Sequence, residues 1–231
     1  MSITKRIKKI ALLGSGKTGQ FVATDLLKAG HEIVVFNRQN QIEQTKLQAC
    51  DAAISFLPPD AFKENADIIM ESQIPLVTGS TGIDYENYRA RIMDNNLTWI
   101  HATNFSMGMI VMEQMIEAFK RCSFLIPSAK LNLHEIHHTK KVDAPSGTAV
   151  TLAKILDRQD LNISFERTGD VVGFHQVEID TGREKIRLSH EAIDRALFAE
   201  GAVYALKLLA TINQPGLYQF NQLIKEQLHK N

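Results

Sequence analysis

The feature that most constrains the fold of this chain is an alternation, through its first half, of short apolar runs with longer segments of helical spacing. Apolar, β-branched runs are typical of buried strands, and apolar residues three and four positions apart are typical of helices that cover them. Strands and helices in this order form a parallel sheet with right-handed crossovers. We expect strands at 7–13, 31–36, 52–57, 74–77 and 97–101, with helices ending near Gly30 and covering 58–72 and 84–95.

A glycine-rich turn follows the first expected strand and opens a helix. Its glycines are Gly14, Gly16 and Gly19, in the Gly-x-Gly-x-x-Gly spacing that binds dinucleotides in doubly wound sheets. There the first glycine permits the tight turn, the second lets the backbone approach a pyrophosphate, and the third allows close packing of helix and strand. The spacing predicts a dinucleotide site, and the alternative is a glycine-rich turn that binds nothing.

The end of the second expected strand bears on the choice of cofactor. Asn37 and Arg38 stand there, and no carboxylate occurs between Phe36 and Ile42. A carboxylate would bind the ribose hydroxyls of NAD, whereas an arginine favours the 2′-phosphate of NADP. The sequence therefore favours NADPH. Because an asparagine can still accept a ribose hydroxyl, NADH stays an alternative.

Two further loops follow strands at the edge where ligands of such sheets bind. Loop 79–82 reads Gly-Ser-Thr-Gly, and loop 102–106 reads Ala-Thr-Asn-Phe-Ser. Clusters of this kind also occur in plain turns. Their shared edge predicts that they face the nicotinamide.

The second half of the chain has a different pattern. Residues 107–121 have helical spacing, while 130–136, 171–179 and 185–188 alternate apolar and polar residues as half-buried strands do. Segments 196–212 and 217–228 are expected to be helices. The chain is thus expected to be an α/β protein with a Rossmann-type, doubly wound parallel sheet and a second α+β unit built on a mixed sheet.

The segment 137–149, His-His-Thr-Lys-Lys-Val-Asp-Ala-Pro-Ser-Gly-Thr-Ala, gathers two imidazoles and two ammonium groups before an apolar helical segment. A helix N-terminus presents free backbone N–H groups and the positive end of a dipole, so it attracts anions. Lys141 adds a full charge, and a neighbouring histidine can donate a proton near neutral pH. The segment predicts a site for a small carboxylate on which proton chemistry is done. The alternative is an ordinary loop with Ser146 as a helix cap.

Three histidines within five residues, His134, His137 and His138, raise the question of a metal site. In a strand His134 and His138 share one face, and His137 points to the other. No nearby cysteine or second cluster completes a tetrahedral set. We therefore expect no metal.

Composition narrows the partners and the compartment. The 231 residues include 26 lysines and arginines and 26 aspartates and glutamates, and the zero net charge argues against a nucleic-acid partner. No apolar run approaches the roughly 18 residues needed to cross a bilayer. Two cysteines are too few for a disulfide framework. We expect a cytoplasmic protein with no nucleic-acid or membrane partner.

Together these motifs resemble the 4-hydroxy-tetrahydrodipicolinate reductase family, the dihydrodipicolinate reductases of bacterial lysine biosynthesis. Segment 137–149 is similar to the signature of that family and is highly specific. Shorter matches follow in the family's order: Gly-Lys-Thr-Gly at 16–19, Gly-Ser-Thr-Gly at 79–82, Asn-Phe-Ser-x-Gly at 104–108, Arg-x-Gly-Asp-x-Val-Gly-x-His at 167–175 and Arg-x-x-Phe-Ala-x-Gly-Ala at 195–202.

The resemblance implies a cofactor domain over 1–106, completed by 196–231. It implies a substrate and oligomerisation domain over 107–195, whose sheet builds a homotetramer. The implied reaction is reduction of 4-hydroxy-tetrahydrodipicolinate, a small dicarboxylate, to tetrahydrodipicolinate by NADPH or NADH, with NADPH favoured.

The resemblance also implies which residues of this chain have the catalytic and binding roles of the family. His137 is the expected general acid, assisted by Lys141, because hydride addition to a dianionic ring leaves negative charge for an acid to neutralise. The expected substrate-binding residues are His138, Lys141, Ser146, Gly147 and Thr148. The expected cofactor-binding residues are Gly14, Gly16, Lys17, Thr18, Gly19, Arg38, Gly79, Thr81 and Asn104.

The chain also departs from the family pattern. It is shorter, with gaps after the second expected strand and between 149 and 167, and Asn37 stands where many members carry an acid. Two other functions stay open: another Rossmann dehydrogenase of amino or keto acids, and a dinucleotide sensor without catalysis. Another dehydrogenase would not require the combination of histidines, lysine and Pro-Ser-Gly-Thr found in segment 137–149. A sensor would not require a proton donor, yet His137 and Lys141 are both present.

Overall fold

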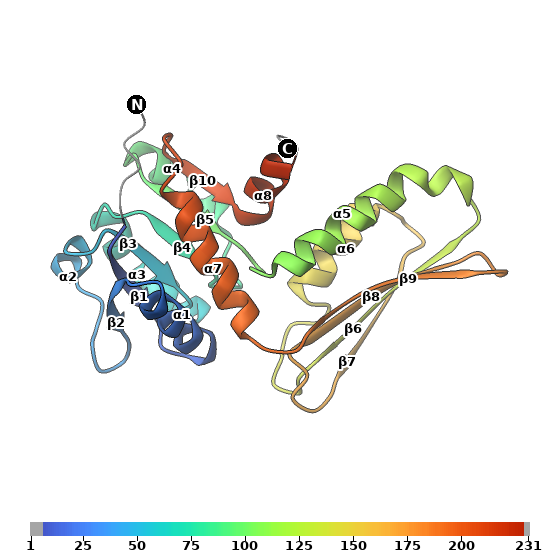
Figure 1. Ribbon diagram of the computed structural model, residues 1–231, viewed down its shortest axis with the longest axis horizontal. Coiled ribbons are helices and arrows are strands. Elements are labelled where there is room, and N and C mark those ends of the chain that lie inside the picture. The colour runs from blue at the N-terminus through green and yellow to red at the C-terminus, as the bar shows by residue number, and fades with distance from the viewer. Residues whose placement is uncertain (1–6, 229–231) are drawn as a thin grey trace. The chain divides into compact units, whose positions relative to one another are not determined.

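The computed structural model describes residues 7–228, and the chain divides into two compact units. One unit takes in residues up to Phe105 together with those from Ala196 onward, and the other is Ser106–Arg195. Figure 1 traces this order, in which the second unit is an insertion along the chain of the first.

The first unit is built on a six-stranded sheet of order β10-β5-β4-β3-β1-β2, in which every neighbouring pair is parallel. Its strands are β1 (Lys9–Leu13), β2 (Glu32–Phe36), β3 (Ala52–Ser55), β4 (Leu76–Thr78), β5 (Thr98–His101) and β10 (Gly216–Gln219). Its helices are α1 (Lys17–Lys28), α2 (Gln44–Gln48), α3 (Pro59–Glu71), α4 (Glu86–Asp94), α7 (Ala196–Leu209) and α8 (Phe220–Leu228). The predicted doubly wound parallel sheet is confirmed.

Successive side chains of a strand point to opposite faces of the sheet. Both faces of this sheet are apolar and are covered by helices (Figure 1). Ala11 and Leu13 of β1 belong to a core that also contains Phe62 of α3 and Ile92 of α4. Helices α1 and α7 pack side by side, although the second unit separates them in sequence (Figure 1). This packing explains why the residues after Ala196 belong to the first unit.

The second unit contains a four-stranded sheet of order β7-β6-β8-β9. Its elements are α5 (Met107–Cys122), η1 (Ser123–Leu125), β6 (Lys130–His137), α6 (Gly147–Leu156), β7 (Asn162–Arg167), β8 (Gly173–Asp180) and β9 (Lys185–Ala192). The β6–β7 pair is parallel and the other two pairs are antiparallel, so the predicted mixed sheet is confirmed. One face carries Leu133 and Val177, which form a core with Met112 and Ile116 of α5 and Leu152 of α6.

Two elements differ from the sequence prediction. The segment 217–228 was expected to be wholly helical, and this is wrong: Gly216–Gln219 form β10, which pairs in parallel with β5, and the helix starts only at Phe220. Strand β7 was not expected at all. It is an edge strand whose residues are almost all exposed, so it lacks the buried alternation that reveals a strand.

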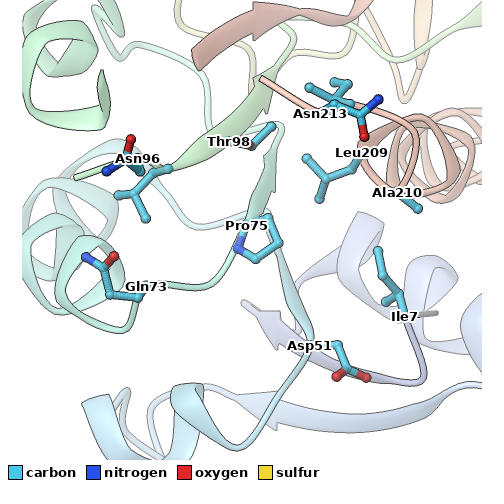
Figure 2. A pocket seen from close by; sticks show the side chains of 11 residues that line it. Ile7, Asp51, Gln73, Pro75, Asn96, Thr98, Leu209, Ala210 and Asn213 are labelled. Carbon is cyan, nitrogen blue, oxygen red and sulfur yellow. The ribbon is translucent and has the colours of Figure 1, made fainter. Parts of the chain in front are cut away.

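A cavity of about 240 Å³ lies at the amino edge of the parallel sheet, and Figure 2 shows Asp51, Pro75, Thr98 and Asn213 among its lining residues. The Asp51 carboxylate there accepts hydrogen bonds from the backbone N–H groups of Lys8 and Lys9, at 2.8 and 2.9 Å. Ligands of doubly wound sheets bind at the opposite, carboxyl edge. Among residues 7–228, no helix is both long and apolar enough to span a membrane.

Candidate functional site

The glycine turn joins β1 to α1 at the carboxyl edge of the parallel sheet. Gly14 has a φ of +98°, a conformation that side chains rarely adopt. A Cβ on Gly19 would lie 2.1 Å from the carbonyl oxygen of Gly14, so only glycine fits there. Lys17 and Thr18 form the first turn of α1, and Gly16 caps it without a side-chain hydrogen bond. Because glycine has no side chain, no N-cap side chain covers the N–H groups of this helix end.

A cavity of about 800 Å³ adjoins this turn. Of the residues expected to bind the cofactor, Gly14, Gly16 and Arg38 line it. Arg38 is exposed, and none of the ion pairs among the described residues involves it. The Asn37 side chain accepts hydrogen bonds from the N–H groups of Gln39 and Asn40, at 2.9 and 3.0 Å, so its oxygen shapes the turn that presents Arg38. An open glycine turn beside an arginine fits a dinucleotide.

The loop 79–82 follows β4 at the same edge of the sheet. A Cβ on Gly79 would lie 2.4 Å from the Phe56 ring, and Phe56 also lines the large cavity. Tyr85 anchors the loop from below, because its hydroxyl donates to the Ser80 carbonyl oxygen at 2.9 Å. Burial raises the pKa of Tyr85. Thr81 is exposed at the tip of the loop.

Asn104 lies just after β5 and is half-buried. It belongs to the first unit, as Gly79 and Thr81 do. Neither it nor the loop 79–82 is among the residues that line the 800 Å³ cavity.

In the second unit, the predicted carboxylate site is built around the N-terminus of α6. The Ser146 hydroxyl accepts a hydrogen bond from the backbone N–H of Ala149 at 3.1 Å, which makes Ser146 the N-cap. Ala149, Leu152 and Leu156 are buried and hold the helix on the sheet. Gly147 and Thr148 form its first turn.

A basic group adjoins this helix end. The Lys141 ammonium contacts both carboxylate oxygens of Asp143, at 2.7 and 2.8 Å. Although burial opposes it, hydrogen bonds from Lys141 and from the backbone of Gly147 hold the pKa of Asp143 below its usual value. An internal carboxylate thus already uses both the lysine and the helix N-terminus, which shows that the arrangement accepts an anion.

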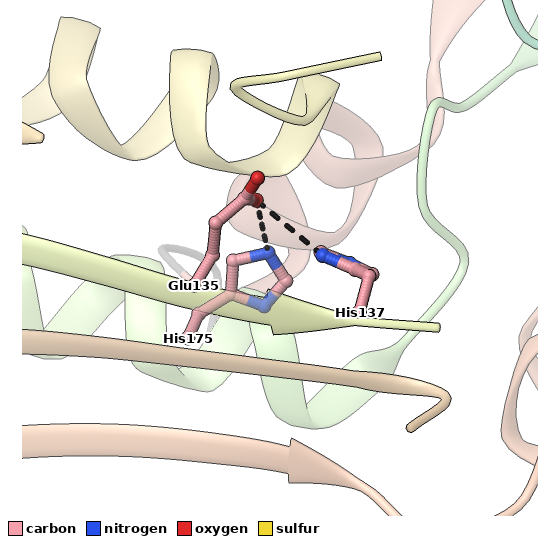
Figure 3. A group of neighbouring side chains, drawn as sticks. All are labelled: Glu135, His137 and His175. Carbon is pink, nitrogen blue, oxygen red and sulfur yellow. Dashed lines mark ion pairs between the residues drawn. The ribbon is translucent and has the colours of Figure 1, made fainter. Parts of the chain in front are cut away.

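Beneath the helix end lies a buried group of Glu135, His137 and His175 (Figure 3). Glu135 is 0% exposed, His175 3% and His137 7%. The Glu135 carboxylate lies 3.6 Å from Nδ1 of His137 and 3.5 Å from Nε2 of His175. It also accepts hydrogen bonds from Ser146 and from Arg167.

Burial, together with the charges of His175, Lys141 and Arg167, lowers the pKa of His137 to about 4, against the opposing charge of Glu135. His137 is therefore neutral at pH 7 when no anion is bound. His138, its neighbour in the sequence, follows β6 and is half-buried.

One possible ligand atom from each of Glu135, His137 and His175 lies within 4.8 Å of the others, which is also the spacing of a metal-binding group. However, Nη2 of Arg167 lies 2.9 Å from the same carboxylate, and its positive charge opposes a cation there. We interpret the group as a buried acid–base cluster.

Glu135, Arg167 and His175 were not among the site residues predicted from the sequence. The period-two alternation of β6 could have placed Glu135 on the face of His137. Arg167 and His175 lie within the motif 167–175 that supported the resemblance. Their approach to Glu135 depends on strand register, which has no local signal.

A doubly wound unit with an open glycine turn, together with an anion-binding unit that contains a histidine cluster, defines a nicotinamide-dependent oxidoreductase of a small anionic substrate. The comparisons specify the family. Residues 8–105 match the family description "Dihydrodipicolinate reductase, N-terminus", and residues 108–224 match "Dihydrodipicolinate reductase, C-terminus".

Relatives agree with this match. The 4-hydroxy-tetrahydrodipicolinate reductase of Christiangramia forsetii is 31% identical over 96% of this chain and 99% of its own. That of Xanthomonas euvesicatoria is 37% identical over 76% of this chain and 74% of its own. A dipicolinate-bound dihydrodipicolinate reductase from Paenisporosarcina sp. TG-14 shares the fold, with a TM-score of 0.69 and 18% identity over 93% of this chain and 98% of its own.

The chain belongs to the dihydrodipicolinate reductase family. The family resemblance drawn from the motifs is confirmed.

Proposed function

We propose that this chain reduces 4-hydroxy-tetrahydrodipicolinate to tetrahydrodipicolinate, a step of the diaminopimelate route to lysine. Family membership supports the proposal. The observation that carries it is the anion-accepting end of α6, with Lys141 beside it and His137 beneath it in the same unit. A small dicarboxylate is the substrate class that such a site recognises.

We assign the cofactor to the first unit and the substrate to the second. A bound reduced nicotinamide supplies hydride. In the first unit, the backbone of the turn 14–19 holds the pyrophosphate, and Lys17 and Thr18 lie beside it. Arg38 binds the 2′-phosphate on the adenosine ribose of NADPH. Gly79, Thr81 and Asn104 line the nicotinamide side of the same edge.

In the second unit, the N–H groups of Gly147 and Thr148 and the ammonium of Lys141 hold the substrate carboxylates, with His138 at the flank. Ser146 supports the substrate site indirectly, because its backbone N–H and its hydroxyl both donate hydrogen bonds to Glu135. A substrate carboxylate takes the place of Asp143 on Lys141. No metal ion is required by these roles.

His137 supplies the proton that accompanies the hydride. In the absence of substrate it is neutral, since its pKa is about 4. The two negative charges of a bound dicarboxylate offset the positive charges of Lys141 and Arg167, so substrate binding raises the pKa of His137. The imidazole therefore takes up a proton when the ring that needs it arrives.

We propose that NADPH is preferred over NADH, and Arg38 tests this. Replacing Arg38 by alanine removes a charge-assisted hydrogen bond to the 2′-phosphate, so KM for NADPH is expected to rise about tenfold or more. KM for NADH is expected to change little, because NADH has no 2′-phosphate. Steady-state kinetics with both cofactors measure the two values, and Gln39→Ala is the neighbouring control. Equal changes for the two cofactors contradict the proposed contact.

We also propose a homotetramer, built through the sheet of the second unit, and a cytoplasmic location. The outer face of this sheet carries half-buried side chains such as Ile136 and Phe174, which a second copy would cover. Cys50 and Cys122 are both free thiols, which suits a reducing compartment.

The test of the function is an assay with freshly generated substrate, in which oxidation of NADPH and of NADH is followed separately. Substrate-dependent oxidation supports the proposal. Turnover of an amino or keto acid in its place favours the rival dehydrogenase. Tight cofactor binding without turnover of either substrate favours a sensor.

A further inference from the structure

The carboxylate of Glu135 is a fully buried charge held by three donor groups from two residues. Its Oε1 accepts from the Ser146 N–H at 3.0 Å and from Nη2 of Arg167 at 2.9 Å. Its Oε2 accepts from the Ser146 hydroxyl. Although burial opposes ionisation, contacts with His175, Ser146 and Arg167 hold the pKa of Glu135 well below its usual range. The group is therefore a permanent negative charge at neutral pH.

Strand register brings the neighbours of this charge together. Glu135 and His137 lie two residues apart on β6 and share the face that α6 covers. His175 stands opposite Glu135 on β8, and Arg167 stands opposite His137 on β7. These positions depend on the backbone of the sheet, so the arrangement is rigid.

The two imidazoles share one carboxylate oxygen. Nδ1 of His137 and Nε2 of His175 lie 3.6 and 3.5 Å from Oε2, with the ring centroids 5.1 Å apart and edge to face. Nδ1 of His137 is buried and has no hydrogen-bond partner among residues 7–228. A separation of 3.6 Å exceeds a hydrogen bond, and such contacts often tighten when substrate binds.

We propose that Glu135 is a positioning residue for the reaction: it fixes the ring of His137, with the hydrogen of the neutral imidazole on Nδ1, and it supports the protonated ring during turnover. This inference rests on the proposed function, in which His137 is the acid. The same carboxylate secures Ser146 at the end of α6, and Arg167 ties the preceding loop to the sheet by donating to the Asp143 carbonyl oxygen at 2.6 Å. One buried charge thus aligns the proton donor with the carboxylate site.

The charged and titratable groups around His137 come from every strand beside it. Arg167 on β7, His175 on β8 and Lys141 after β6 all disfavour a proton on His137. Glu135 alone among these four groups favours it. Removal of the Glu135 charge therefore weakens the proton affinity of His137.

Two replacements of Glu135 separate charge from shape. With Glu135→Gln, the pH at which kcat falls as His137 loses its proton in the substrate complex is expected to move down by about one unit. With Glu135→Asp, which keeps the charge, this midpoint is expected to stay within about 0.3 unit of the wild type. The KM for NADPH is expected to stay unchanged in both. Asp160→Asn removes an exposed carboxylate of the same unit and serves as the control.

A purely structural role for Glu135 gives a different result. Both replacements would then lower the melting temperature and the amplitude of the profile but leave its midpoint in place, and that outcome overturns the proposal.

Glu135→Gln leaves Arg167 without its buried partner, and such a change can prevent folding. If the variant does not fold, a measurement on the wild-type protein still tests the proposal. A long-range ¹H–¹⁵N spectrum, with the His137 signals assigned by their absence in His137→Gln, identifies the nitrogen that carries the hydrogen. Hydrogen on Nδ1 is expected, and hydrogen on Nε2 overturns the proposal. This spectrum needs no substrate, so its outcome is separate from failure of the reductase assay.

Discussion

Replacement of His137 by glutamine is expected to lower kcat by about 10²- to 10⁴-fold, the usual contribution of a general acid. Glutamine approximates the size of the imidazole and keeps a hydrogen-bond donor, but it has no proton to release. His137 lies in the second unit, away from the glycine turn in the sequence, so the Kd for NADPH is expected to stay at the wild-type value. Steady-state turnover and fluorescence titration with NADPH measure the two quantities.

Replacement of Lys141 by alanine tests the other half of the same site. The lost charge-assisted hydrogen bond to a substrate carboxylate is expected to lower kcat/KM by about 10- to 100-fold. Lys140→Ala is the matched control, because Lys140 is exposed and adjacent in sequence. Its kinetics are expected to equal those of the wild type.

Wild-type turnover in both His137→Gln and Lys141→Ala would remove these residues from the reaction. A loss of NADPH affinity that matches the loss of turnover would instead mean that the replacements act on the whole fold. Melting temperatures of the variants distinguish these cases.

Much of the fold could be predicted because its signals are local. Most residues of β1 and β3 are apolar and buried, and a buried strand shows this composition whatever its partners are. The segment 137–149 could also be interpreted locally. Its lysine, its histidines and the start of α6 are neighbours along the chain, so spacing alone brings them together.

The remaining features depend on contacts between distant residues. Gly216–Gln219 form a strand because β5 offers a free edge, and the sequence Leu-Tyr-Gln-Phe at 217–220 suits a helix equally well. Glu135 and His175 are 40 positions apart and meet only through the register of β6 and β8. A one-residue slip in that pairing would turn every side chain of one strand to the other face.

The glycine turn yields the second large expected effect: replacing Gly19 is expected to reduce both stability and NADPH binding, and replacing Gly16 is expected to reduce NADPH binding alone. Gly19→Ala would place a Cβ 2.1 Å from the carbonyl oxygen of Gly14, a backbone atom that cannot rotate away. Overpacking of this kind costs about 1–3 kcal/mol. For a chain of this length the melting temperature is therefore expected to fall by roughly 2–12 °C. Because the turn itself must open, NADPH binding is expected to be lost as well.

Gly16→Ala is the matched replacement, since a Cβ at Gly16 meets no atom within 4 Å. The free energy of unfolding is expected to stay within about 1 kcal/mol of the wild type, the cost of a poorer N-cap. The added methyl group nevertheless occupies the space in which the backbone approaches the pyrophosphate, so the Kd for NADPH is expected to rise about tenfold or more. Thermal melting and NADPH titration of both variants decide the matter. Wild-type NADPH affinity in Gly16→Ala would show that the pyrophosphate binds elsewhere, and an unchanged melting temperature in Gly19→Ala would show that the turn and α1 are not in close contact.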